Sequence, residues 1–123
     1  MNRYPNPVPT PAASPANPVS YRVAWGAAGV SCWVLYPYGV KRPLRHVRRH
    51  SSALEYGYVG SGPTDLALSI LADHVGHLHV PSDLSWAFAI EHLGPEVLDR
   101  DEFDLSYTLV AAWLATRQLA RRA

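Results

Sequence analysis

Aromatic and β-branched residues gather between residues 21 and 38, and from Gly62 onward apolar residues recur at helical spacing. Residues 21–25 and 30–38 combine aromatic and β-branched side chains, which favour strands. The small residues between them, 26–29, suit a hairpin turn. A third short strand is expected at residues 44–47. The first part of the chain is therefore predicted to form a small antiparallel sheet.

After Gly62 the spacing of apolar residues becomes helical. Leu66, Ile70 and their apolar neighbours fall on one face of a helix expected over residues 63–75. Gly76 is expected to end this helix.

Two more helices are predicted further along. The second is expected to follow a cap at Ser82 or Asp83. Ser106 is predicted to cap the third, and residues 95–104 between them read as an acidic loop with a helical turn. The inward residues are expected to be Trp86, Ile90 and Leu93 in the second helix, and Leu109, Val110, Trp113 and Leu114 in the third.

Strands that precede helices indicate an α+β fold, in which the helices cover one face of the sheet. Residues 20–123 are predicted to form this single domain. Residues 1–19 contain six of the eleven prolines and few large apolar side chains, so they are interpreted as a flexible tail that orders only on a partner.

The amino-acid composition excludes several kinds of structural site and several classes of protein. Cys32 is the only cysteine, which excludes an internal disulfide and a cysteine-based zinc cluster. No apolar run approaches the ~20 residues that cross a bilayer, and the N-terminus lacks the apolar region of a signal peptide. We therefore expect no membrane association and a cytoplasmic location.

Charge is distributed unevenly, although the net charge is +1. Residues 1–54 contain no acid and sum to +7, whereas residues 55–123 carry ten acids against four arginines, a balance of −6. The two halves either complement each other within the fold or present charged faces to a partner. The acids between residues 99 and 104 read as a solvated face.

Residues 41–50, the basic segment, carry the strongest functional signal. Five cations in ten residues suit contact with a phosphate backbone or an acidic protein, but charge also protects an exposed sheet edge from pairing. Tyr56 and Tyr58 flank Gly57 and would share one face of an extended chain, as core residues or as a platform for a partner. The predicted partner-binding residues are Lys41, Arg42, Arg45, Arg48, Arg49, Tyr56 and Tyr58.

The glycine-rich turn before the first helix offers a second candidate site. Backbone N–H groups at a helix N-terminus bind anions, so an anion site at Gly60, Ser61, Gly62 and Thr64 competes with an ordinary structural turn. The lysine of a phosphate-binding loop is missing. Asp65 would bring its own carboxylate to the positive end of this helix, which favours the structural turn.

Four residues near the end of the first helix resemble a metal cluster. Asp73, His74, His77 and His79 offer the ligand types of a zinc site, but their spacing does not ensure convergence, and surface or packed histidines are the alternative. The serines form no nucleophile elbow. We expect no catalytic residues and no cofactor.

The glycine-rich string also carries a family resemblance. It resembles the pattern aromatic-Gly-Tyr-x-Gly-Ser-Gly-Pro-x-x-Leu-Ala-Leu-x-x-Leu of a small uncharacterised domain found in bacteria, their plasmids and phages. The similarity runs from about Tyr21 to the C-terminus and leaves the proline-rich tail outside. It implies a bacterial or phage context but no activity. The matching residues are Tyr56, Gly57, Tyr58, Gly60, Ser61, Gly62, Pro63, Leu66, Ala67, Leu68 and Leu71.

Three functions are consistent with these patterns. The first is a small non-enzymatic binding module, an accessory protein of a phage or mobile element that docks on a host protein or nucleoprotein, such as a defence or transcription complex. The second is direct nucleic-acid binding through the basic segment. The third is a metal- or phosphate-handling enzyme.

Overall fold

The computed structural model describes residues 17–122, and in the last helix it describes side chains as far as Arg117. Most of the predicted tail therefore lies outside the described residues. The elements are β1 (Ser20–Gly26), β2 (Gly29–Leu35), η1 (Pro37–Gly39), β3 (Lys41–Pro43), α1 (Ser61–Val75), α2 (Ser82–His92), η2 (Pro95–Val97), β4 (Glu102–Ser106) and α3 (Tyr107–Arg122).

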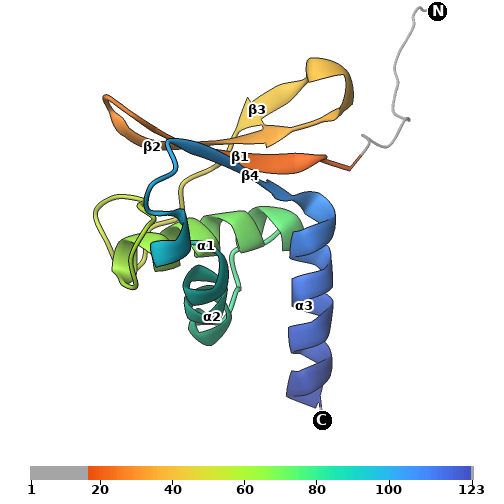
Figure 1. The fold of residues 1–123 in the computed structure, drawn as a ribbon. Coiled ribbons are helices and arrows are strands. Elements are labelled where there is room, and N and C mark those ends of the chain that lie inside the picture. Colours follow the sequence, from red (N-terminus) through yellow and green to blue (C-terminus); the bar gives the residue numbers. More distant parts are fainter. Residues whose placement is uncertain (1–16, 123) are drawn as a thin grey trace, which may run out of the picture.

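A four-stranded antiparallel sheet lies against three helices, so the predicted α+β class is confirmed. The strand order is β3-β2-β1-β4. In Figure 1 the sheet lies above, α1 runs beneath it, α2 lies below α1, and α3 descends from the end of β4. One face of the sheet is thus covered by helices and the other is open.

Alternation along the strands builds the core. Tyr21 and Val23 of β1 and Val34 of β2 are fully buried against the helices, because successive side chains point to opposite faces of a sheet. The predicted hairpin joins β1 to β2, and Gly26 pairs with Gly29 across its turn. Cys32 also points inward and is buried, and burial raises the pKa of its thiol to about 12, helped by the charge of Asp73.

The strand predicted at residues 44–47 is wrong, because the third strand is β3, just before it. Leu44 still donates its N–H to the Cys32 carbonyl (2.9 Å). The Val47 N–H instead bonds the Ser69 hydroxyl of α1 (2.8 Å). The chain therefore leaves the sheet between these residues and crosses to the helix.

The loop predicted at residues 95–104 is only partly correct. Its helical turn is confirmed as η2, but its end belongs to β4, which pairs with β1. Phe103 and Leu105 are buried while Glu102 and Asp104 are exposed. This alternation is a strand signal, obscured by the acids. One strand thus follows the first two helices.

The predicted inward stripe of α2 is wrong. Trp86 and Ile90 are 46% and 42% exposed, whereas Leu84 and Phe88 are buried. The predicted side-chain cap is also wrong, since α2 begins after Pro81 without one. Leu93 is inward as expected.

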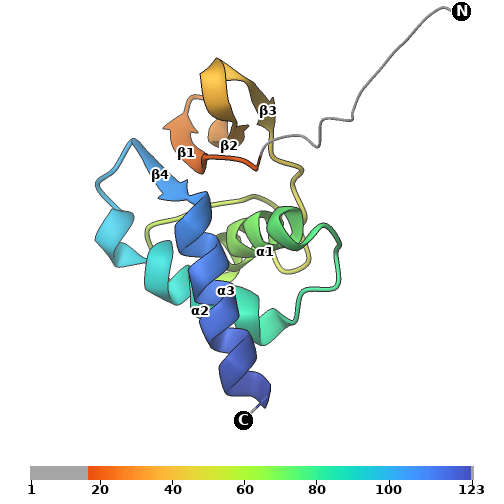
Figure 2. The ribbon, with the colours of Figure 1, turned by 90° about the vertical axis from the view of Figure 1, so that its right-hand side faces the viewer.

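The cap of α3 is confirmed, since the Leu109 N–H donates to the Ser106 hydroxyl (3.0 Å). Val110, Trp113 and Leu114 are buried as expected, whereas Leu109 is 36% exposed. Figure 2 shows that α3 crosses in front of α1 and α2 when seen from its own side.

Candidate partner-binding surface

Side chains of α1 hold the backbone of the basic segment. Ser69 is 1% exposed, and its hydroxyl accepts the Val47 N–H and donates to the Val47 carbonyl (3.2 Å). One turn earlier, Asp65 Oδ2 accepts the N–H groups of Arg49, His50 and Ser51 at 3.1, 2.9 and 2.8 Å. The path of this segment is therefore set by the core helix.

Asp65 has a different role from the one predicted. Helix α1 begins at Ser61 after Gly60, so Asp65 lies in the second turn and does not meet the helix N-terminus. Its side chain is fully buried, and the Ser51 hydroxyl adds a fourth hydrogen bond to Oδ2 at 2.8 Å. Burial by itself would raise the pKa of Asp65, but the hydrogen bonds from residues 49–51 outweigh it and lower this pKa.

Two of the five cations of the basic segment, Arg42 and Arg49, bind other parts of the same chain. Arg42 pairs with Asp73 (2.7 Å) and donates to the Tyr36 hydroxyl (3.0 Å). Arg49 donates to the backbone carbonyls of Val80 (3.2 Å) and Leu78, and so holds the loop between α1 and α2. These two arginines have internal partners that a docking protein would have to displace.

The other three cations face solvent. Lys41 lies over the Trp33 ring, 4.5 Å from its centroid. Arg48 donates to the Ser52 carbonyl (2.8 Å). Arg45 is exposed and lines a hollow of about 350 Å³ with Asp73 and other residues. Lys41, Arg45 and Arg48 are thus the members of the predicted set whose charge lies at the surface without a salt bridge in the described part of the chain.

The predicted tyrosine pair does not share one face. Tyr56 is half-buried, its hydroxyl bonds the Arg100 carbonyl, and its ring packs edge-on against Phe103 with the centroids 5.0 Å apart. Tyr58 is 40% exposed. The rings diverge because Gly57 between them has φ +97°, outside the extended region.

The glycine-rich turn makes room for side chains of the preceding loop. A Cβ on Gly60 would lie 2.5 Å from the Tyr58 ring, and one on Gly62 would lie 2.6 Å from a Glu55 carboxylate oxygen. The Tyr58 hydroxyl donates to the same carboxylate. A chain carboxylate therefore occupies the start of α1, and this carboxylate is Glu55 rather than the predicted Asp65.

The other residues of the predicted anion site also have internal roles or face outward. Thr64 donates its hydroxyl (2.7 Å) and its N–H (3.1 Å) to the Gly60 carbonyl. Ser61 is exposed. An anion at this turn would also meet the Glu55 charge, and like charges about 4 Å apart repel by about 4 kcal/mol at an effective dielectric constant of about 20. The geometry favours the structural turn.

The four predicted metal ligands point to different neighbours. Asp73 receives hydrogen bonds from Arg42 and from the Tyr21 hydroxyl (3.2 Å). The His74 ring stacks on Tyr107 at 4.4 Å. The other two histidine rings lie 5.9 Å apart, and over the described part of the chain no three metal-binding side chains come together. Burial lowers the pKa of His74, against the opposing effect of the Asp73 charge.

The family model that matches this chain covers residues 22–116. These residues include β2, β3, β4, α1 and α2, most of β1 and the first part of α3. Its description is a family of unknown function, DUF6166. The chain belongs to this family. Membership in a family of unknown function, predicted from the glycine-rich string, is thereby confirmed.

The chain matches no curated protein and no solved structure. Among the helices that the structure describes, each is too short or too polar to span a bilayer.

Proposed function

We propose that this protein is a small non-enzymatic binding module that docks on an acidic surface of a partner protein or nucleoprotein. The contacts are made by Lys41, Arg45 and Arg48. The observation that carries the proposal is that buried Ser69 and Asp65 bind the backbone of Val47 and of residues 49–51. These residues lie on both sides of Arg48 and follow Arg45, so the exposed cations extend from a segment that the core helix holds.

Rigid support matters because binding must offset the entropy of ordering the surface. Immobilising a long side chain costs about 0.5–1.5 kcal/mol, and a loop that orders on binding adds to this cost. Here the loop is already ordered by hydrogen bonds to α1. In this proposal the protein acts in the bacterial cytoplasm as an accessory protein of a phage or mobile element. The family resemblance of the glycine-rich string supports this setting.

The proposal is tested by affinity capture from a nuclease-treated bacterial lysate. We expect an acidic protein captured by the wild type to be lost with the double variant Arg45→Gln and Arg48→Gln. The control is Arg117→Gln, which removes a half-buried arginine of α3 that pairs with Glu91. Equal capture by the double variant and the wild type would refute the proposed surface.

Direct nucleic-acid binding is the second candidate, because the same exposed cations suit phosphates. Three phosphate contacts predict a slope of log affinity against log salt near about −2.7, from about −0.9 per contact. Raising salt from about 50 to about 200 mM would then weaken binding about 40-fold. Fluorescence anisotropy with a short DNA duplex measures this, and absence of binding at micromolar protein in low salt removes the candidate.

A further inference from the structure

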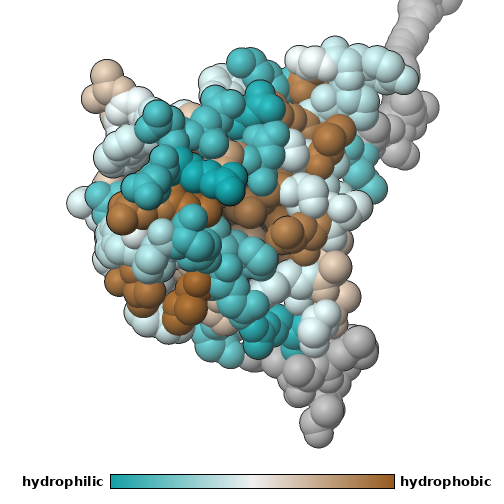
Figure 3. Space-filling model, in the orientation of Figure 1, coloured by the Kyte–Doolittle hydropathy of each residue, from teal (hydrophilic) through white to brown (hydrophobic). Residues whose placement is uncertain are grey.

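A hollow of about 390 Å³ lies between the end of β1 and the segment that leads from η2 to β4. Its lining consists of Trp25, Tyr56, Leu98, Asp99, Arg100 and Asp101. In Figure 1 the η2–β4 segment rises from beside α1 to the start of β4, and Figure 3, in the same orientation, shows hydrophilic residues directly beside hydrophobic ones on this face of the molecule. The basic segment begins with β3 at the opposite edge of the sheet, and its Arg48 lines a neighbouring hollow with Trp25.

Two aromatic rings form the walls of this hollow. Trp25 is 55% exposed, and its backbone N–H donates to the Asp101 carbonyl (2.8 Å), which ties the hairpin to the acidic segment. The Tyr56 ring stands at 71° to the indole with the centroids 6.2 Å apart. The Tyr56 ring also packs against Phe103, and its hydroxyl donates a hydrogen bond to the Arg100 carbonyl. The Tyr56 wall is therefore held in place before any ligand arrives.

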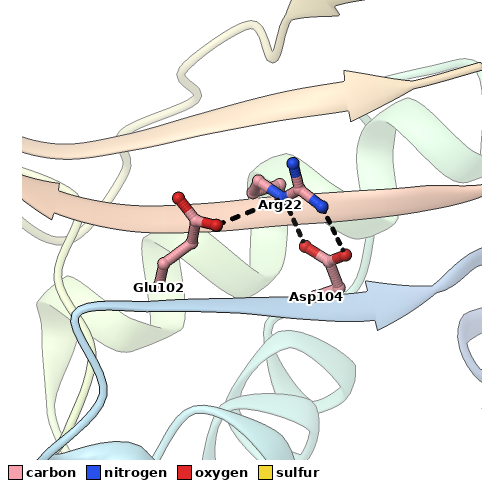
Figure 4. A network of polar contacts seen from close by, with 3 residues as sticks. All are labelled: Arg22, Glu102 and Asp104. Carbon is pink, nitrogen blue, oxygen red and sulfur yellow. Dashed lines mark hydrogen bonds and ion pairs between the residues drawn. The ribbon is translucent and has the colours of Figure 1, made fainter. Parts of the chain in front are cut away.

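The carboxylates at the rim differ from the neighbouring acids of β4. Arg22 binds Asp104 through two hydrogen bonds of 2.8 and 2.9 Å and lies 3.6 Å from Glu102, as Figure 4 shows on β1 and β4. Asp99 and Asp101 form no ion pair with any cation in the described part of the chain.

The charge of Asp101 acts on the tyrosine of this hollow. Burial raises the pKa of Tyr56, and the charge of Asp101 raises it further. Arg100 lies on the same rim and offsets part of this charge, but neither Trp25 nor Tyr56 has a cation over its ring within the described residues. Exposed indole surface and unpaired carboxylates thus face the same space.

We propose that this hollow binds the guanidinium group of an arginine from a partner protein. A cation is attracted to the face of an aromatic ring, most strongly to tryptophan. Guanidinium stacks on such a face while its N–H groups reach carboxylates in the same plane. Two walls and two acids supply both interactions, and charge complementarity selects a basic occupant. The lining of this site contains no residue of the basic segment.

The test uses N-acetyl-arginine amide as the probe and the indole N–H signal of Trp25 in NMR spectra, assigned with Trp25→Phe. We expect a saturable shift in the millimolar range. N-acetyl-norleucine amide, which has a neutral stem, should cause none. The double variant Asp99→Asn and Asp101→Asn should weaken binding by about fivefold or more, and Arg100→Gln should strengthen it.

Matched controls show whether binding depends on the acids of this hollow. Glu96→Gln removes an acid of η2 that does not line the hollow, and it should leave binding unchanged. Arg45→Gln should also leave it unchanged, because Arg45 lines a different hollow. An equal shift with the norleucine probe, or unchanged binding by the aspartate double variant, would overturn the proposal. A dimer in sedimentation experiments that the aspartate variants abolish would overturn the assignment to a different protein, because a second copy would then supply the arginine.

Discussion

The buried carboxylate of Asp65 gives the sharpest test of how the basic segment is held. Its Oδ2 accepts four hydrogen bonds from residues 49–51, while Oδ1 is buried without a partner in the described residues. Asp65→Asn preserves the shape and one acceptor oxygen but removes the charge. Asp65→Ala removes the acceptor as well.

The magnitude follows from the hydrogen bonds. A bond to a charged group contributes about 1.5–3 kcal/mol and a neutral one about 0.5–1.5 kcal/mol. Because the four donors share one oxygen, their contributions do not add in full. We expect Asp65→Asn to lower the free energy of unfolding by about 2–3 kcal/mol. Asp65→Ala should lower it by about 3–5 kcal/mol, since it leaves half-buried N–H groups without an acceptor.

The measurement is urea unfolding near neutral pH, followed by tryptophan fluorescence. Asp99→Asn is the control, because it neutralises an exposed aspartate, and it should change the free energy of unfolding by no more than about 0.5 kcal/mol. If Asp65→Asn were as stable as this control, the Asp65 charge would not hold the segment.

The difference in stability between the wild type and Asp65→Asn should depend on pH. The folded pKa of Asp65 lies below its ordinary value, so its stabilisation is present above the unfolded pKa of about 3.9 and is lost as pH falls through the folded pKa. The stabilities of the wild type and Asp65→Asn should therefore converge at acid pH. A constant difference down to the lowest pH measured would contradict the assigned ionisation.

Three further predictions concern the core and the glycine-rich turn. Gly62→Ala should lower the free energy of unfolding by about 1–3 kcal/mol, because its Cβ would meet Glu55; Gly26→Ala, with only an ordinary 3.8 Å contact, should change it by less than about 1 kcal/mol in the same urea assay. Cys32, whose pKa is about 12, should react with a thiol reagent at mildly alkaline pH at least about a thousandfold more slowly in the folded protein than in urea, and rapid labelling of the folded protein would contradict its burial. Burial lowers the pKa of His74 and of His92, so the folded state takes up protons less readily than the unfolded state. The free energy of unfolding should therefore fall as pH drops below the histidine pKa of the unfolded chain, about 6.5. Replacing both histidines with glutamine should flatten that decline.

Much of the fold was accessible from local patterns. The hairpin, α1 and the cap of α3 follow from strand propensity, helical spacing and one serine. β4 was missed because acids on its open face resemble a loop, although Phe103 and Leu105 alternate with them. The stripe of α2 was misassigned because Trp86 and Ile90 share a helical face that the core does not use.

The candidate surfaces were only partly visible. The basic segment stands out in the sequence, but no local signal tells that Arg42 and Arg49 have internal partners while Arg45 and Arg48 face outward. The hollow assigned to a partner's arginine combines a residue of β1 with residues from the segment before β4. Nothing in the spacing of these positions along the chain indicates that they meet.

The amino-acid sequence alone determined the class of fold, the main helical and strand segments and the position of the basic segment, because periodicity and charge are properties of neighbouring residues. Tertiary structure alone decided that Asp65 holds the backbone of residues 49–51 rather than the start of its own helix. It also decided which cations form salt bridges and that Trp25, Asp99 and Asp101 line the same hollow. The physical reason is that hydrogen bonds and ion pairs depend on distance in space. The packing of the sheet and the helices sets these distances between residues that lie far apart in the sequence.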